Sequence, residues 1–298
     1  MIPLTEAHKK FVDHLKSQKR ASATILAYGK DVEQLVDFLN QLDKTHVHHV
    51  TADDIKAFLA KLEKNGYTAK SLSRKLNSTK TFFRFLKVEE VITDDPAFLV
   101  SHPKFETKPP RTLSPMEYRA LRDAARDDPR IAAIVEVLLQ TGIRISELAN
   151  LRMGDVIFSE SSREGQLYIR PQESHSERTI PLNRAAELAL KRYLSHRPQP
   201  KKAAKNPADE YLFITKTGHQ LLIRNIRTAI DRYFKKAGIK DAKVNDLRHT
   251  WVTHHLTQGA SLILVSKLAG HKRLSTTEKY LNLIQPERKE EKTKLEEL

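Results

Sequence analysis

The chain has 298 residues, a mass of 34.2 kDa and no cysteine, so disulfides, thiolate metal sites and a cysteine nucleophile are excluded. Its formal net charge of +15 favours a polyanionic partner, most often nucleic acid. No apolar run approaches the roughly 20 residues that span a bilayer, and residues 1–10 lack the apolar core of a secretory signal. We therefore expect a cytoplasmic protein without a membrane partner.

The length predicts about two domains, and charge and composition locate their boundary. Residues 1–107 carry 17 Lys/Arg against 14 Asp/Glu, whereas residues 108–298 hold +12 of the net charge. Between them, residues 101–111 read SHPKFETKPPR, with three prolines and no helical period. Proline lacks an N–H donor and biases the preceding residue away from helix. We expect an N-terminal domain over residues 1–107 and a C-terminal domain over residues 108–298.

The N-terminal domain is predicted to be helical. Apolar residues recur at helical spacing in residues 6–15, 22–39, 51–65 and 68–88. Ser22 and Thr51 are predicted N-caps, and Gly66 is a predicted helix end. The last helix carries a basic face whose residues are Lys70, Arg74, Lys75, Lys80 and Arg84. Such a face suits a DNA backbone, although taken alone a solvated surface explains it as well.

The C-terminal domain is predicted to be mostly helical with a small β insertion. Ser114 followed by Pro115 predicts a helix start, and residues 131–140 form an apolar helix. Short strands are predicted at residues 166–169, 178–182 and 211–214, with a turn over residues 171–177. Helices resume near residue 224, and the charged segment 286–298 is a candidate tail helix.

The candidate chemistry is that of a phosphodiester. The chain has no glycine-rich phosphate loop, and its histidine spacings match no standard zinc pattern, so we expect no cofactor and no metal. Arg144 and Arg248 can bind the non-bridging oxygens of a phosphate and neutralise charge in its transition state. Tyr280 can attack phosphorus and store the bond energy in a phosphotyrosine. His271 lies nine residues before Tyr280.

Together these segments resemble the tyrosine recombinase (phage-integrase) family, particularly its Xer-like members. The motifs occur in family order at residues 141–148 (TGIRISEL), 245–250 (NDLRHT), 265–271 (VSKLAGH) and 275–281 (STTEKYL). The distances from Arg248 to His271 and from His271 to Tyr280 are 23 and nine residues, both typical of the family. Residues 5–105 resemble the family's N-terminal core-binding domain.

The resemblance implies a mainly α fold with a small β-sheet insertion. A four-helix SAM-like core-binding domain would join a catalytic domain to form a C-shaped DNA clamp. It implies catalytic roles for Arg144, Asn245, Arg248, His271 and Tyr280. Glu147 and His249 would support the arginines. The partner implied is double-stranded DNA with an inverted-repeat site, bound by a dimer and recombined in a tetramer through a Holliday junction. No small-molecule substrate is expected, and a nucleoid-associated location is implied.

Two positions depart from the family pattern. The first histidine of the family's HxxR motif is Asn245 here, which can donate a hydrogen bond but cannot carry charge. The family's hairpin lysine, which protonates the leaving 5′ oxygen, aligns with Glu173, and no lysine occurs from residue 153 to 190. His175 in the same turn is the first candidate for a replacement acid, and Lys216 is the second.

Two alternative functions remain open at this point. One is a DNA-binding protein that keeps the recombinase fold and has lost cleavage, because two catalytic positions are altered. The other is an enzyme that resembles type IB topoisomerases and relaxes DNA by cutting one strand. A recombination assay with two sites separates all three functions.

Overall fold

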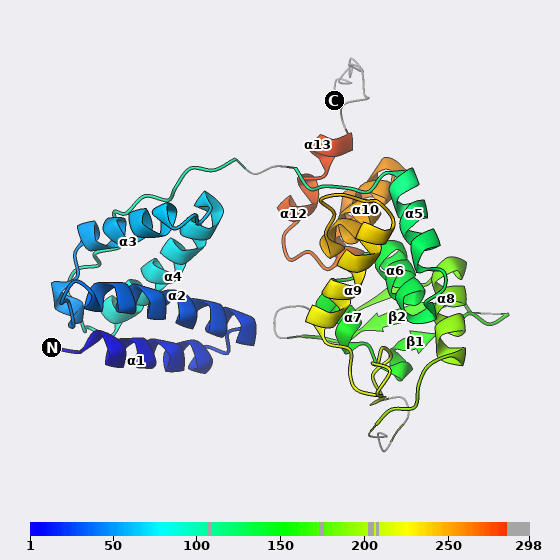
Figure 1. Cartoon of the computed structure of the whole chain (residues 1–298), viewed down its shortest axis with the longest axis horizontal. Coiled ribbons are helices and arrows are strands. Elements are labelled where there is room, and N and C mark those ends of the chain that lie inside the picture. Colours follow the sequence, from blue (N-terminus) through cyan, green and yellow to red (C-terminus); the bar gives the residue numbers. More distant parts are fainter. Residues whose placement is uncertain (107–108, 162, 173–175, 202–205, 207–208, 285–298) are drawn as a thin grey trace, which may run out of the picture. The chain divides into compact units, whose positions relative to one another are not determined.

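The computed structural model describes residues 1–106, 109–161, 163–172, 176–201, 206 and 209–284. The predictions for Glu173, His175 and the tail 286–298 lie outside these residues. The chain divides into two units, Met1–Thr107 and Lys108–Leu298 (Figure 1). Each unit has its own hydrophobic core. No helix in the described part is long and apolar enough to cross a membrane.

The N-terminal unit is built from four α-helices in its described residues. They are α1 (Leu4–Ser17), α2 (Ser22–Asn40), α3 (Ala52–Lys64) and α4 (Ala69–Val88), with a short 3-10 turn, η1 (Val47–His49), before α3 (Figure 1). Helix α2 packs against α1 and α4, and the buried rings of Phe11 and Phe82 meet edge to face at 5.4 Å. The apolar spacing that predicted these helices therefore corresponds to their buried faces.

The helix starts in this unit confirm one predicted cap and correct another. Thr51 caps α3 in a capping box with Asp54, which satisfies backbone N–H groups that the first turn leaves unpaired. Ser22, in contrast, is the first residue of α2, and Ala21 is the N-cap. Gly66 follows α3 with φ of 82°, as expected for a helix end.

The C-terminal unit surrounds the apolar helix α6 (Pro129–Thr141). This helix packs against α5 (Pro115–Ala125), α8 (Arg184–Ser195) and α10 (Val244–Thr257), as Figure 1 shows. Ser114 caps α5 in a capping box, as predicted. The remaining helices are α7 (Ile145–Asn150), α9 (Ile223–Lys236), α11 (Leu262–Ala269), α12 (Ser275–Glu278) and α13 (Leu281–Ile284).

A three-stranded antiparallel sheet lies within this unit in the order β1-β2-β3. Its strands are β1 (Val156–Ile157), β2 (Gln166–Ile169) and β3 (Arg178–Pro181), with η2 (Met153–Asp155) before β1. The predicted β2 and β3 are confirmed, and Leu167 faces Ile180 across them. The predicted strand 211–214 is wrong, because Tyr211 and Ile214 make only isolated bridges, to Arg152 and Gln220.

Candidate active site

Arg144 is placed by the end of helix α6. Gly142 ends that helix with φ of 61°, and a Cβ there would lie 2.3 Å from the ring of Trp251, so only glycine fits. Arg144 then becomes the N-cap of α7, and its backbone N–H donates to Glu147 at 2.8 Å. Its guanidinium donates to the Gly270 carbonyl at 2.6 Å and to Glu147 at 3.1 Å. These contacts fix the position of the guanidinium.

Glu147 is a buried carboxylate that holds two arginines. Arg178 donates to both of its oxygens, at 2.9 and 2.8 Å, and to the Leu268 carbonyl at 2.7 Å. Burial alone would raise the pKa of Glu147, but the hydrogen bonds and charges of Arg178 and Arg144 outweigh it and lower that pKa. Glu147 is therefore ionised at neutral pH.

Arg178 was not predicted as a site residue. It lies on β3 two positions before the buried Ile180, and side chains two apart in a strand share a face. This alternation was the available signal that Arg178 points inward. Gly270 completes the contact, because with φ of 71° its backbone leaves room for this guanidinium, whose Cζ would lie 2.8 Å from a Cβ.

Arg248 lies on α10 and is almost fully buried. One nitrogen, Nη1, donates to the Gly142 carbonyl, whereas Nη2 has no hydrogen-bond partner among the described residues. Burial, and secondarily the charge of Arg144, lower the pKa of Arg248 to about 10, so it is still charged at neutral pH. A buried guanidinium with an unpaired N–H is stabilised by an anion that binds beside it.

His271 follows Gly270 directly, and its Nδ1 lies 2.7 Å from the hydroxyl of the buried Thr277. Burial first, and then the charges of Arg248 and Arg144, lower the pKa of His271 to about 4. The ring is therefore neutral at neutral pH. A bound phosphate would oppose these positive charges and raise that pKa.

Tyr280 lies two residues after α12 and is buried against Trp251 and Val265. Its hydroxyl oxygen is 2.5 Å from Nδ1 of His249, and its ring stacks on that of His271 at 6.3 Å. Burial raises the pKa of Tyr280, while the charge of Arg248 opposes this.

Asn245 joins the same cluster through His249. Its Nδ2 lies 2.7 Å from Nε2 of His249, one helical turn further along α10. The structure thus brings together, within one unit, seven residues predicted from the sequence. They are Arg144, Glu147, Asn245, Arg248, His249, His271 and Tyr280.

Comparisons with known proteins bear on this cluster. A family model described as the phage integrase family matches residues 111–286. The chain belongs to that family. A model of the phage integrase N-terminal SAM-like domain matches residues 9–90. The tyrosine recombinase XerC of Oceanobacillus iheyensis is 32% identical over 279 residues, which cover 92% of this chain and 90% of that protein.

Solved structures share the fold. A lambda integrase dimer bound to a COC′ core site matches with a TM-score of 0.76 and 18% identity, covering 98% of this chain and 81% of that one. A lambda integrase tetramer bound to a Holliday junction matches with a TM-score of 0.71 and 19% identity, covering 92% and 78%. The predicted family, fold and enzyme class are confirmed: the chain is a site-specific tyrosine recombinase, and cleavage and rejoining of DNA are characteristic of its family.

Two basic cavities adjoin the clustered residues of the recombinase. One, of about 830 Å³, is lined by Arg178, His271 and Lys272 among others. The other, of about 490 Å³, is lined by Arg227, Lys243, Asn245 and Arg248 among others. Cations along both cavities suit a polyanion that passes the cluster.

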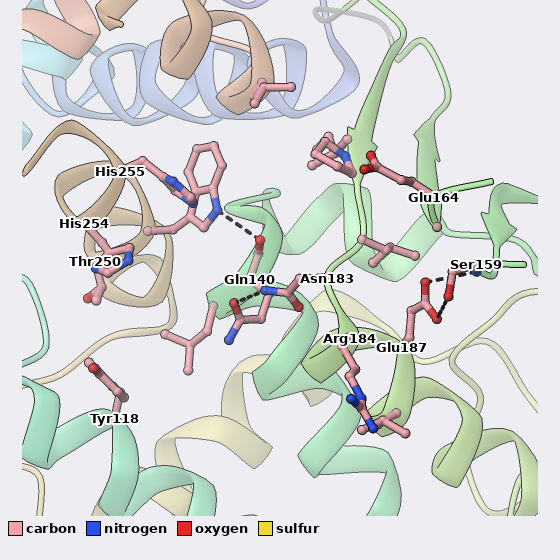
Figure 2. Close-up of a pocket in the computed structure, with 18 of the residues that line it drawn as sticks. Tyr118, Gln140, Ser159, Glu164, Asn183, Arg184, Glu187, Thr250, His254 and His255 are labelled. Carbon is pink, nitrogen blue, oxygen red and sulfur yellow. Dashed lines mark hydrogen bonds between the residues drawn. The ribbon is translucent and has the colours of Figure 1, made fainter. Parts of the chain in front are cut away.

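A third cavity, of about 860 Å³, is not this site. Its lining includes Gln140, Asn183 and Glu187, which Figure 2 labels, and also Trp251. None of the seven clustered residues contributes to it. The Trp251 ring N–H donates to the Gln140 carbonyl there at 3.0 Å. We identify the site from its converging polar groups rather than from cavity size, because phosphate recognition depends on such groups.

Lys216, a predicted general acid, is exposed on the turn that precedes Gly218. No hydrogen bond or ion pair in the described part joins it to the cluster. The described residues also contain no group of three or more acidic or histidine side chains placed to hold a metal ion.

The basic face predicted on α4 is only partly a surface. Lys75 is buried, and its ammonium donates to Asp31 at 2.9 Å and to Gln34 at 2.6 Å. Its assignment to the exposed face was therefore wrong. Lys70, Arg74 and Arg84 are exposed, and Lys80 is half-buried with its ammonium 3.2 Å from the Phe98 carbonyl.

Proposed function

We propose that Tyr280 is the nucleophile of this recombinase. Its hydroxyl oxygen attacks the scissile phosphate, forming a 3′-phosphotyrosyl bond and releasing a 5′ hydroxyl. The bond energy is conserved in the phosphotyrosine, so rejoining needs no nucleotide. The observation that carries this proposal is the buried Tyr280 ring beside Arg248, whose Nη2 has no partner among the described residues.

Arg144, Arg248 and His271 bind the phosphate and stabilise the transition state in this proposal. Two guanidiniums neutralise the charge that grows on the non-bridging oxygens. Glu147 and Arg178 hold Arg144 and the Gly270 segment in place, which is supported by the contacts that converge on Glu147. His271, with Nδ1 directed at Thr277, is left to donate from Nε2.

The proposed partner is duplex DNA with an inverted-repeat site, bound by two copies and recombined by four. The dimer and tetramer of lambda integrase on DNA, which share this fold, support that assembly. The net charge of +12 on residues 108–298 and the basic cavities beside the cluster support DNA as the ligand.

The nucleophile is tested by Tyr280→Phe. This variant should bind site DNA as the wild type does and form no covalent complex. A nicked substrate that traps the covalent intermediate, resolved on a denaturing gel, provides the measurement. A covalent band that survives in Tyr280→Phe would refute the assignment. A wild-type chain that binds DNA and yields no band would favour the alternative of a recombinase fold that has lost cleavage.

We propose that Lys216 or His175 protonates the leaving 5′ oxygen in place of the family's hairpin lysine. Replacing that oxygen with sulfur removes the need for the proton, because a thiolate leaves unprotonated. A variant that lacks the acid should cleave the oxygen substrate about 10²–10⁴-fold more slowly and the sulfur substrate at nearly the wild-type rate. Lys216→Ala and His175→Ala compare the two candidates. If both variants cleave the oxygen substrate at the wild-type rate, neither residue is the acid.

A further inference from the structure

The nucleophilic oxygen of Tyr280 lies next to one imidazole in the described structure, and it is not that of His271. Nδ1 of His249 is 2.5 Å from this oxygen, and the two ring centroids are 5.6 Å apart. His271 stacks on the Tyr280 ring, but its Nδ1 is directed at Thr277. His249 is therefore the imidazole within reach of the phenol proton.

The orientation of the Asn245 amide determines which nitrogen of His249 carries the proton. Its Nδ2 is 2.7 Å from Nε2. When its N–H donates to Nε2, the neutral ring carries its proton on Nδ1 and donates to the Tyr280 oxygen. When the amide turns by 180°, Oδ1 accepts from Nε2–H, and Nδ1 is free to accept the phenol proton. An asparagine at this position is compatible with both tautomers.

We propose that His249 is the catalytic residue that takes the proton of Tyr280 during cleavage and returns it during rejoining, with Asn245 as the residue that positions its ring. This inference rests on the proposed role of Tyr280. In cleavage, the bond between Tyr280 Oη and phosphorus forms, the bond from phosphorus to the 5′ oxygen breaks, and the phenol proton moves to Nδ1 of His249. The 5′ oxygen takes its proton from a separate acid. Rejoining reverses each step.

The groups around His249 suit an imidazole that starts neutral. Burial lowers its pKa; the charge of Arg248 lowers it further, and Asp246 opposes both. Burial also raises the pKa of Tyr280. The resting pair is therefore a neutral phenol and a neutral imidazole. The phenol proton becomes acidic only as its oxygen bonds to phosphorus, which is when a base within hydrogen-bonding distance accelerates the reaction.

Single-turnover cleavage of a nicked substrate by the full chain tests the proposal. His249→Ala and His249→Gln should each cleave about 10²–10⁴-fold more slowly than the wild type, with DNA binding unchanged. His254→Ala, at an exposed position on the same helix, is the matched control and should cleave at the wild-type rate. Wild-type cleavage by His249→Ala would overturn the proposal.

A fluorinated tyrosine at position 280 separates a base from a structural contact. Fluorine lowers the phenol pKa, so a nucleophile that has lost its base should gain far more rate from fluorination than the wild type does. An equal gain in the wild type and in His249→Ala would overturn the role of His249, even if that variant is slow. Tyr280→Phe tests the nucleophile separately from the base. A covalent complex in that variant would refute Tyr280 as the nucleophile, whatever the role of His249.

Asn245 is tested by the pH profile of cleavage. Asn245→Asp keeps an acceptor for Nε2–H and adds a negative charge, which raises the pKa of His249. In Asn245→Asp, the pH at which the cleavage rate rises should therefore be higher than in the wild type. Asn245→Leu should slow cleavage without shifting the pH profile. An unchanged profile in Asn245→Asp would show that Asn245 does not position this ring.

Discussion

Each unit of the molecule holds a buried carboxylate that binds two cations. In the N-terminal unit, Asp31 accepts from Arg74, Lys75 and Ser78. In the C-terminal unit, Glu147 accepts from Arg144 and Arg178. A buried carboxylate is costly unless it is paired and hydrogen-bonded, and both acids meet that requirement.

In both clusters, one cation is buried and the other is more exposed. One cation is buried, with side-chain exposure of 7% for Lys75 and 6% for Arg178, and it neutralises the acid. The second is more exposed, 49% for Arg74 and 23% for Arg144, so the acid orients it toward the surface.

The clusters differ in what surrounds them. Beside the Glu147 cluster lies Arg248, whose Nη2 has no partner in the described structure. Burial first, and then the charge of Arg248, lower the pKa of His271 there. No comparable orphan nitrogen occurs among the described residues of the N-terminal unit. A surplus of oriented positive charge, rather than the number of basic residues, therefore distinguishes an anion site from a paired structural cluster.

The largest effect is expected for Glu147→Ala. It leaves the buried guanidinium of Arg178 without its partner, and breaking a buried pair costs about 3–5 kcal/mol of the free energy of unfolding. Chemical denaturation measures this loss. Asp31→Ala is the matched variant and should lower stability while leaving single-turnover cleavage intact. A loss in Glu147→Ala of only about 0–1 kcal/mol, typical of surface pairs, would contradict the buried-cluster argument.

Arg248→Ala should slow DNA cleavage and have little effect on the free energy of unfolding. Loss of one donor to the transition-state oxyanion typically slows the chemical step by about 10²–10³-fold. Binding to site DNA should barely change, because a single phosphate contact is lost among many. Single-turnover cleavage and a binding titration on the same substrate separate the two quantities. An equal loss in both would show that Arg248 acts as an ordinary binding contact.

The lowered pKa of His271 predicts that the C-terminal unit becomes less stable at acid pH. The folded pKa of about 4 lies below the usual value near 6.5, so the unfolded chain binds more protons between these pH values. The free energy of unfolding should therefore fall as pH decreases from about 6.5 to 4. At about 1.4 kcal/mol per pKa unit, the loss has an upper bound of about 3.5 kcal/mol. His271→Gln should flatten this dependence in a denaturation series, and an unchanged slope would contradict it.

The sequence predicted the parts of the fold that local periodicity determines. The helices were predictable because their apolar residues repeat at helical spacing. The error at residues 211–214 has the same origin, since a short run of buried residues, Leu212, Phe213 and Ile214, does not distinguish a strand from a buried turn. The two-residue strand β1 was missed because two residues give no alternation.

The residues of the candidate site could be predicted from the sequence, but the contacts between them could not. Family motifs identified Arg144, Arg248, His271 and Tyr280 by order and spacing. Asn245 and His249 are four residues apart on α10, a spacing at which side chains of a helix are neighbours, and they are in contact. The contact of His249 with Tyr280 joins residues 31 apart in sequence, so only the tertiary structure provides it.

The misplacement of Lys75 also has a physical reason. Lys75 is three residues after Leu72 and four before Thr79, both buried, so helical geometry places it on the inner face. A lysine there is stable only with a buried acid, and Asp31 on α2 is distant in sequence. The charge pattern of α4 alone therefore overestimated its basic surface.

The smallest effect is expected on α4, where the salt dependence of DNA binding distinguishes surface cations from Lys75. Each cation that contacts a phosphate releases counterions on binding, so its loss lowers the slope of log affinity against log salt by about one. Lys70→Ala and Arg84→Ala should each show this decrease, because both side chains are exposed. Lys75→Met should leave the slope unchanged and reduce the free energy of unfolding, since it leaves Asp31 with one charge partner fewer. Equal slopes in Lys70→Ala, Arg84→Ala and the wild type would show that α4 does not contact the DNA backbone. A lower slope in Lys75→Met would instead mean that the Asp31 pair opens when DNA binds.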